Sequence, residues 1–165
     1  MNQTALYIAK LESLKTGDLG LLAINLGKGL DESIQGFDLF SGLWWPLRKK
    51  NPQVPRRKVA WLIAKLYASC PVPHSTGHYL PVQLALCVPH DLREKYRFKR
   101  RFDLLLTMPV GQIEQEIRWV LGKMASRKLK LDWVQLTGDL SNWERERTRF
   151  KWAEQFLNEL ERRQS

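Results

Sequence analysis

Apolar side chains recur at helical spacing in three separate segments, and this pattern constrains the fold more than any other feature of the sequence. Residues 59–70 and 113–124 each carry one such stripe. The third stripe has the spacing i, i+4, i+7 and i+8, and it consists of Phe98, Phe102, Leu105 and Leu106. A half-buried strand would alternate with a period of two, so these segments predict amphipathic helices.

Most of the remaining sequence also favours helices over strands. Further helices are expected over residues 2–16, 33–47, 82–87 and 131–140, followed by a long terminal helix that ends near Arg162. Residues 20–30 contain too much glycine for a long helix. The sequence therefore predicts an all-α fold of about eight helices, arranged as two small helical-bundle halves.

Local residue types suggest where several helices begin and end. Gly17 suits the position after a helix and Asp18 the N-cap of the next one, while Pro46 predicts the end of the helix over residues 33–47. Asp132 is expected to cap a short helix. Ser141 and Glu144 have the spacing of a capping box, so we expect them to open the terminal helix.

A loop with strong turn chemistry, CPVPHSTGH at residues 70–78, predicts the boundary between the two halves. We expect an N-terminal helical half at residues 1–90 and a C-terminal helical half at residues 91–165. His74 and His78 are expected to hold this loop in place through side-chain hydrogen bonds.

The chain is strongly basic, with 27 Lys and Arg residues against 17 Asp and Glu residues and a net charge of +10. A surplus of this size favours a polyanionic partner, and nucleic acid before membrane. No apolar run reaches 18 residues, and two cysteines do not make a disulfide framework in a chain of this length. These features predict a soluble, cytoplasmic protein.

Four stretches, residues 48–58, 93–101, 118–130 and 145–151, hold 21 of the 27 basic residues. Any one of them could be a solvated surface, but four with little compensating acid favour a shared polyanion-binding surface. The predicted nucleic-acid-binding residues are Arg56, Arg57, Lys58, Arg93, Arg97, Arg100, Arg101, Lys123, Arg127, Lys128, Arg145, Arg149 and Lys151.

The stretch YRFKRRF, residues 96–102, sets a ring or a positive charge at every position. Helical spacing assigns the aromatic rings to the core. Arg93, Arg97 and Arg100 then lie on the opposite face, with Arg101 at its edge. In the terminal helix, Arg145 and Arg149 share a stripe with Trp152, which would hold the guanidinium groups at the margin of the core.

No pattern in the sequence predicts catalysis or a cofactor. The spacing of Cys70, His74, His78, Cys87 and His90 matches no common zinc site, and Cys70 falls on the apolar stripe of its helix. Nucleotide-binding and serine-nucleophile motifs are absent from the sequence. We therefore expect a binding protein without metal or cofactor and not an enzyme.

The C-terminal sequence LDWVQLTGDLSNWERERTRFKWAEQFL resembles the signature of the CasB family, the small subunit of the type I-E CRISPR Cascade complex. The matching positions are Leu131, Trp133, Leu136, Asp139, Leu140, Trp143, Arg149, Trp152, Ala153 and Phe156. An early L-x-x-L-K-x-G-D, the loop AKLYASCPVPHSTG and R-R-F-x-x-L-L agree with the resemblance. The family commonly has arginines shortly after the early G-D, whereas this chain offers only Lys28 there.

The resemblance implies a non-catalytic, all-α subunit that pairs with a second copy of itself in Cascade. Its partners would be the large subunit, the backbone subunits, the guide RNA (crRNA) and the target DNA, including the displaced strand. A subunit that accepts any target sequence should contact phosphates and not base edges. The alternative from the residues is a protein–protein scaffold with a basic surface, and a small nuclease that uses the loop histidines ranks behind both.

Overall fold

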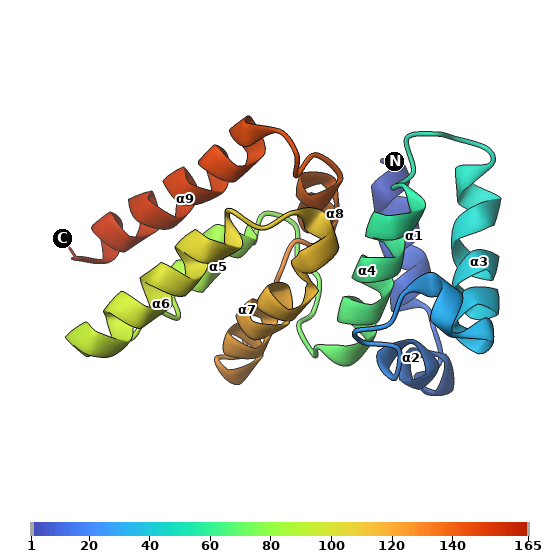
Figure 1. The fold of residues 1–165 in the computed structure, drawn as a ribbon, viewed down its shortest axis with the longest axis horizontal. Helices are drawn as coiled ribbons and strands as arrows, with labels where there is room; N and C mark the ends of the chain where they lie inside the picture. The colour runs from blue at the N-terminus through green and yellow to red at the C-terminus, as the bar shows by residue number, and fades with distance from the viewer. Residues whose placement is uncertain (1, 165) are drawn as a thin grey trace. The chain divides into compact units, whose positions relative to one another are not determined.

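The computed structural model describes residues 2–164, which form nine α-helices and two short 3-10 helices (Figure 1). These residues contain no β-strand, so the all-α prediction is confirmed. The α-helices are α1 (Gln3–Glu12), α2 (Thr16–Ala23), α3 (Ile34–Arg48), α4 (Arg57–Ser69), α5 (Leu80–Ala85), α6 (Leu92–Leu105), α7 (Glu114–Ser126), α8 (Trp133–Ser141) and α9 (Glu146–Gln164). The 3-10 helices are η1 (Leu30–Glu32) and η2 (Val110–Gln112).

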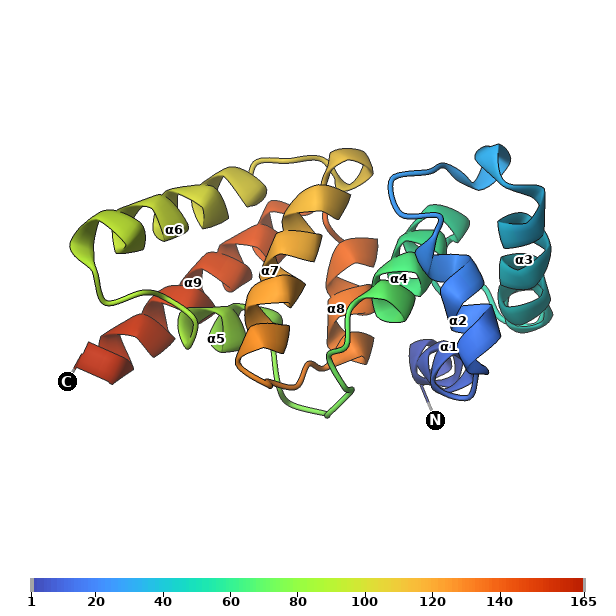
Figure 2. The same cartoon turned by 90° about the horizontal axis from the view of Figure 1, so that it is seen from below.

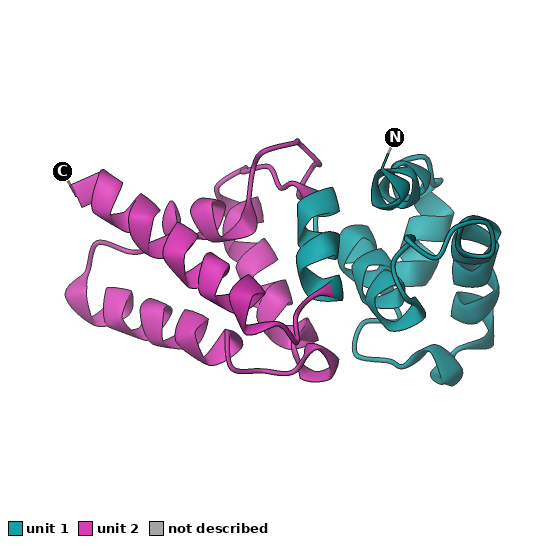
Figure 3. Ribbon diagram, turned by 90° about the horizontal axis from the view of Figure 1, so that it is seen from above, with its two compact units in different colours: residues 1–71, 133–141 teal, residues 72–132, 142–165 magenta. Residues whose placement is uncertain are grey.

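Packing divides the chain into two compact units (Figure 3). Unit 1 contains residues 1–71 together with residues 133–141, and unit 2 contains residues 72–132 together with residues 142–165. Helix α8 thus packs with the N-terminal helices although it follows the CPVPHSTGH loop by more than 50 residues. The halves expected at residues 1–90 and 91–165 differ from these packing units and stay a prediction.

Helix α4 is the centre of unit 1. Every residue from Val59 to Leu66 is buried, because α1, α2, α3 and α8 all pack against this helix. The Tyr7 hydroxyl of α1 donates a hydrogen bond of 2.6 Å to the carbonyl oxygen of Ala60. On another side of α4, the ring of Trp61 lies edge-on to that of Phe40 in α3, with centroids 5.5 Å apart. Lys65, the one charged residue in this buried run, donates to the carbonyl oxygen of Lys28 at 2.9 Å. A helical run that is buried on all sides is stable only when it is enclosed in this way.

In unit 2, α6 and α9 run antiparallel (Figure 2). The rings of Phe102 and Phe156 pack with centroids 4.3 Å apart. Beyond the end of α6, the indole N–H of Trp143 donates to the carbonyl oxygen of Met108 at 2.7 Å, next to the start of α9. The expected stripe of α7 is fully buried, and it consists of Ile113, Ile117, Val120, Leu121 and Met124.

Backbone hydrogen bonds join the CPVPHSTGH loop to the segment before α8. Ser75 N–H donates to the carbonyl oxygen of Leu131 at 2.9 Å, and Asp132 N–H donates to that of His78 at 2.8 Å. The Asp132 carboxylate accepts from Gly77 N–H, whose φ of +88° suits glycine. Nδ1 of His78 is buried without a hydrogen-bond partner, so this ring nitrogen does not supply the expected restraint.

The boundary predicted between the first two helices is wrong. Helix α1 ends at Glu12, and α2 already begins at Thr16 with Lys15 as its N-cap. Gly17 and Asp18 therefore lie inside the first turn of α2, where the Asp18 carboxylate interacts favourably with the helix dipole.

Pro46 does not end α3, which continues to Arg48. A proline ring removes only one helical hydrogen bond, from its own position to the carbonyl of residue 42. The bond from Lys49 N–H to the carbonyl oxygen of Trp45, at 2.9 Å, is kept. Because Pro46 lies in the last turn, the loss of one bond there is tolerated.

The expected capping box is also wrong, because Ser141 is the last residue of α8 and α9 begins only at Glu146. The Ser141 hydroxyl donates to the carbonyl oxygen of Thr137 at 2.8 Å instead. Between the two helices, Trp143 is 1% exposed and packs edge-on against Trp152. The burial of this indole outweighs the local capping signal of SNWE.

The packing of α6 predicts that Phe102→Ala lowers the free energy of unfolding by about 3–5 kcal/mol, the usual cost of removing a core ring. Phe102 is 1% exposed, whereas Leu104 on the same helix is 51% exposed. Leu104→Ala is the matched control and is expected to change stability by about 0.5 kcal/mol or less. Urea unfolding of both variants makes the comparison, and equal losses would contradict the assignment of faces.

Tyr7 predicts a loss of stability at alkaline pH. Burial raises the pKa of Tyr7 well above its ordinary value. In the unfolded chain the group ionises near its ordinary pKa of about 10. The stabilisation from the neutral buried phenol is thus fully present below that pH and is lost as the pH rises further. Between pH 9 and 11, the free energy of unfolding should fall less for Tyr7→Phe than for the parent. Urea unfolding at several pH values measures this, and an equal fall for both proteins would contradict the prediction.

Candidate nucleic-acid interface

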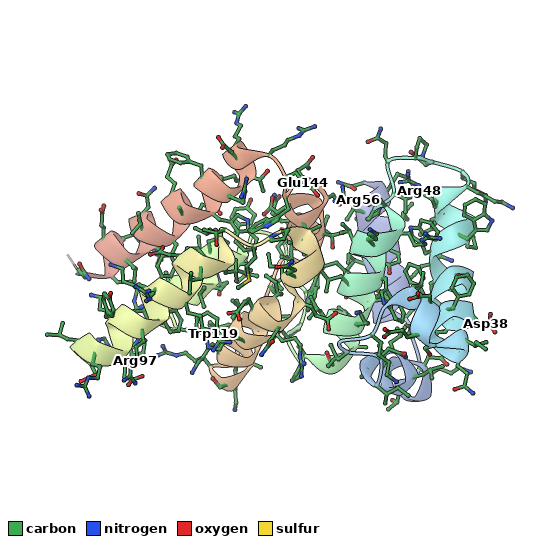
Figure 4. The ribbon with its side chains drawn as sticks, in the orientation of Figure 1. Asp38, Arg48, Arg56, Arg97, Trp119 and Glu144 are labelled. Carbon is green, nitrogen blue, oxygen red and sulfur yellow. The ribbon has the colours of Figure 1, made fainter. Side chains whose placement is uncertain are left out.

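The outer face of α6 presents three arginines to solvent. Arg93, Arg97 and Arg100 are exposed, whereas Phe98 and Phe102 on the opposite face are 5% and 1% exposed. The predicted division of these residues into an inner and an outer face is confirmed. Figure 4 labels Arg97 on this helix. Its guanidinium lies 3.3 Å from Glu94, an exposed pair that adds little stability and leaves the charge accessible.

Tyr96 departs from the expectation that all aromatic rings of YRFKRRF lie in the core. Its residue is 65% exposed, on the same side of α6 as the arginines. Helical geometry explains the difference, because Tyr96 lies two residues before Phe98 and thus about 200° away around the helix. The outer face of α6 therefore carries one ring among its charges.

Arg101 is engaged within unit 2. Its guanidinium donates to both carboxylate oxygens of Glu116 on α7, at 2.8 and 3.5 Å. It also lies over the Trp119 ring, 4.4 Å from the centroid, and Figure 4 labels Trp119 on α7. The Glu116 side chain is only 15% exposed. Arg101 thus links α6 to α7. This contact leaves fewer of its N–H groups available to a phosphate.

The basic residues near the start of α9 differ in their exposure to solvent. Arg145 and Lys151 are exposed, whereas Arg149 is half-buried. The Arg149 Nη1 atom lies 3.5 Å from the carbonyl oxygen of Leu106, and its Nε is buried without a hydrogen-bond partner. Arg149 therefore sits at the margin of the core, as the stripe pattern predicted, with part of its guanidinium facing the α6–α9 packing.

In unit 1 the predicted basic residues surround the start of α4. Arg57 and Lys58 are exposed in its first turn, and Arg56 at the N-cap donates to the carbonyl oxygen of Ser141 at 3.0 Å. Arg48 binds the carbonyl oxygens of Pro52 and Val54, so it organises the basic loop before α4. The stretch at residues 48–58 thus mixes structural and exposed cations.

A second basic cluster of unit 2 lies around the end of α5. Arg127 donates to the carbonyl oxygen of Leu86, and Arg163 donates to that of Ala85, which also accepts from Val88 N–H at 3.3 Å. Burial raises the pKa of the Cys87 thiol, and the charges of Arg127, Arg163 and Lys123 partly lower it, which places all three near this sulfur. Lys128 follows α7 with a φ of +56° and is exposed.

Arg163 was missed by the sequence analysis, which placed the end of the terminal helix one residue before it. Its position relative to Leu160 and Phe156 on α9 does not predict the contact with Ala85, because Ala85 lies 78 residues away in the chain. Only the packing of α5 against α9 brings them together.

The structure divides the 13 predicted residues between the two units. Arg56, Arg57 and Lys58 belong to unit 1, and the other ten belong to unit 2. Unit 2 holds 17 basic and 11 acidic residues, and unit 1 holds ten and six, so both units are basic. Within unit 2 three of the ten lie on the outer face of α6, Arg101 lies in the α6–α7 contact, three lie near the start of α9, and the other three lie near the end of α7, where Lys123 and Arg127 are close to Cys87.

Within residues 2–164, no three His, Cys, Asp or Glu side chains lie close enough to share a metal ion. Cys70 is half-buried at the end of α4 and not fully buried as its stripe position suggested, because α4 ends at Ser69. No helix among the described residues has the length and apolar character needed to cross a membrane.

Residues 25–157 match the sequence model of the CRISPR-associated protein Cse2. Among solved structures, CasB from M. ruber aligns with a TM-score of 0.78 at 20% identity, covering 98% of this chain and 96% of that one. CasB from Thermus thermophilus gives 0.74 at 19%, covering 96% and 99%, and CasB from Thermobifida fusca gives 0.72 at 14%, covering 94% and 98%. These likenesses show a shared fold. No curated protein sequence matches the chain.

The contacts of Arg101 predict that Arg101→Ala destabilises unit 2 by about 1 kcal/mol, because Glu116 loses its partner while both groups keep some access to solvent. Arg100→Ala, one residue away on the exposed face, is the matched control and should be nearly neutral. Urea unfolding compares them. A larger loss for Arg100→Ala than for Arg101→Ala would contradict the assignment of Arg101 to the α6–α7 contact.

Proposed function

The chain belongs to the CRISPR-associated Cse2 family, and we propose that it is the non-catalytic small subunit of a type I-E Cascade complex. In this role it stabilises the pairing of guide RNA with target DNA and holds the displaced strand. Its partners are then the large subunit, the backbone subunits and a second copy of itself.

The observation that carries this proposal is the outer face of α6. Three arginines are exposed there while the rings beneath them are buried, so their position does not depend on a ligand. Guanidinium groups bind phosphate through charge-assisted hydrogen bonds, which are about twice as strong as neutral ones. Phosphates are the same for every sequence, which suits a subunit that accepts any target.

The exposed members of the predicted binding set outside α6 extend the same chemistry over both units. They are Arg57, Lys58, Lys123, Arg127, Lys128, Arg145 and Lys151. Exchange between a DNA duplex and an RNA–DNA duplex is nearly balanced in free energy, so contacts worth a few kcal/mol are enough to favour the open state. Arg101 contributes less to binding on this proposal because Glu116 already holds its guanidinium.

A protein–protein scaffold remains the second candidate, and one observation favours it. Helix α3 exposes Ile34 at 83%, Phe37 at 44% and Trp45 at 53%, and large exposed apolar side chains are typical of protein interfaces. Contact with other Cascade subunits would use such a surface. The two functions differ in one measurable respect, because a scaffold alone would bind isolated nucleic acid negligibly.

We expect the triple variant Arg93→Glu/Arg97→Glu/Arg100→Glu to bind labelled 20-nucleotide strands more weakly than the parent at low salt. Its log–log salt slope should be smaller by about 2–3, since each phosphate contact contributes about 0.7–0.9. Fluorescence anisotropy from 50 to 300 mM salt measures both quantities for single-stranded and duplex ligands.

The matched control is Lys10→Glu/Lys15→Glu/Lys28→Glu. It makes the same change in net charge at exposed positions of unit 1 that lie outside the predicted set. Its salt slope should stay near that of the parent. If both triple variants lose affinity equally, the effect is one of overall charge. A parent protein with no salt-dependent binding would favour the scaffold.

A further inference from the structure

The ring of Tyr96 lies between two arginines on an open helix face, where its other neighbours at helical spacing are the exposed Leu92 and the half-buried Lys99. Arg93 precedes it by three residues and Arg100 follows it by four, so both are its neighbours on the helix surface. Arg97 is adjacent in sequence on the same exposed side. At 65% exposure, most of the Tyr96 residue is open to solvent.

The other large exposed rings have different surroundings. Phe150 on α9 is 69% exposed, but its neighbours at helical spacing include Glu146 and Glu154. Trp45 on α3 is 53% exposed, and its basic neighbours Arg48 and Lys49 both follow it in the chain. Arg48 is already bound to the carbonyl oxygens of Pro52 and Val54. Of these three rings, Tyr96 alone has an exposed arginine at helical spacing on both sides along its helix.

We propose that Tyr96 stacks on an unpaired base and makes the outer face of α6 selective for single-stranded nucleic acid. This inference rests on the proposed function and refines it. Aromatic side chains bind single strands in this way because every base has a π-face, so stacking tolerates any sequence. The flanking arginines hold the phosphates of the same strand, and the ring takes a base.

The discrimination comes from the ring and not from the charges. Phosphates are accessible in both a duplex and a single strand, so Arg93, Arg97 and Arg100 can bind either form. The bases of a duplex are already stacked and paired, and presenting one to Tyr96 would require it to leave the stack, which is unfavourable. Only a strand with unpaired bases gains from the ring.

The acidic residues of α6 leave this site open. Glu94 is two positions from Tyr96 and lies on another side of the helix, where it contacts Arg97 at 3.3 Å. Asp103 lies seven residues after Tyr96, about two turns away. Around the ring itself, the side chains at i−3 and i+4 are both arginines.

The test uses the full chain and three labelled probes: a 20-nucleotide oligo-dT strand, a 20-unit abasic strand with the same number of phosphates, and a 20-base-pair duplex. Tyr96→Ala should weaken binding of oligo-dT by about 5- to 100-fold, which corresponds to about 1–3 kcal/mol per stacked base. Affinity for the abasic strand and for a 20-base-pair duplex should stay within about twofold of the parent. The salt slope should not change, because the variant removes no charge.

Two control variants sharpen the result. Tyr96→Phe keeps a ring and should bind oligo-dT like the parent, whereas Phe150→Ala removes an equally exposed ring from α9 and should have no effect. If Tyr96→Ala weakens oligo-dT, abasic and duplex binding alike, or if Phe150→Ala matches it, the stacking proposal is wrong.

The same titrations separate this inference from the function on which it rests. A parent that binds with a steep salt dependence, together with an unaffected Tyr96→Ala variant, overturns the stacking role and leaves the phosphate contacts in place. A parent that binds none of the three probes overturns both. Far-UV circular dichroism of Tyr96→Ala confirms the fold, which an exposed position should preserve.

Discussion

The contact between Phe102 and Phe156 determines which side of α6 faces solvent. With the two rings 4.3 Å apart, α6 is fixed against α9 in unit 2. Phe98 packs against Trp119 on α7 and fixes the other end of the same face. A helix held on one side at two points cannot rotate, so its remaining side must carry Arg93, Arg97 and Arg100 outward. The exposed cations are thus a consequence of core packing.

The basic residues differ in function according to whether a carbonyl oxygen or a carboxylate lies close enough to bind them. Arg101 meets Glu116 and Trp119, and Arg127 and Arg163 meet carbonyl oxygens at the end of α5. Cations in such places stabilise the fold first, and their charge still adds to the local field. Side chains such as Arg93 and Arg100 lie away from these acceptors and are available to a ligand. Sequence composition alone cannot separate the two groups.

The sequence predicted the helices and their buried faces well, because a period of 3.6 residues is a local property. The stripe of α7 and the inner face of α6 followed from spacing alone. The errors arose where a distant contact competed with a local signal, as when the burial of Trp143 displaced the capping box at Ser141. Tyr96 was assigned to the core with the other rings of its stretch, although its angle around the helix places it outside. The partners of Arg101 and Arg163 lie on other helices and were not predictable.

A ring beside the arginines has a thermodynamic consequence that charges alone lack. A bound protein shifts an equilibrium only by the difference between its affinities for the two states. Contacts to phosphates contribute to that difference only where opening of the DNA brings additional phosphates within reach. Stacking of Tyr96 on an unpaired base is possible only in the open state, so its whole free energy would favour strand separation. On the proposed function, the arginines of α6 hold the strand and this ring stabilises the open state.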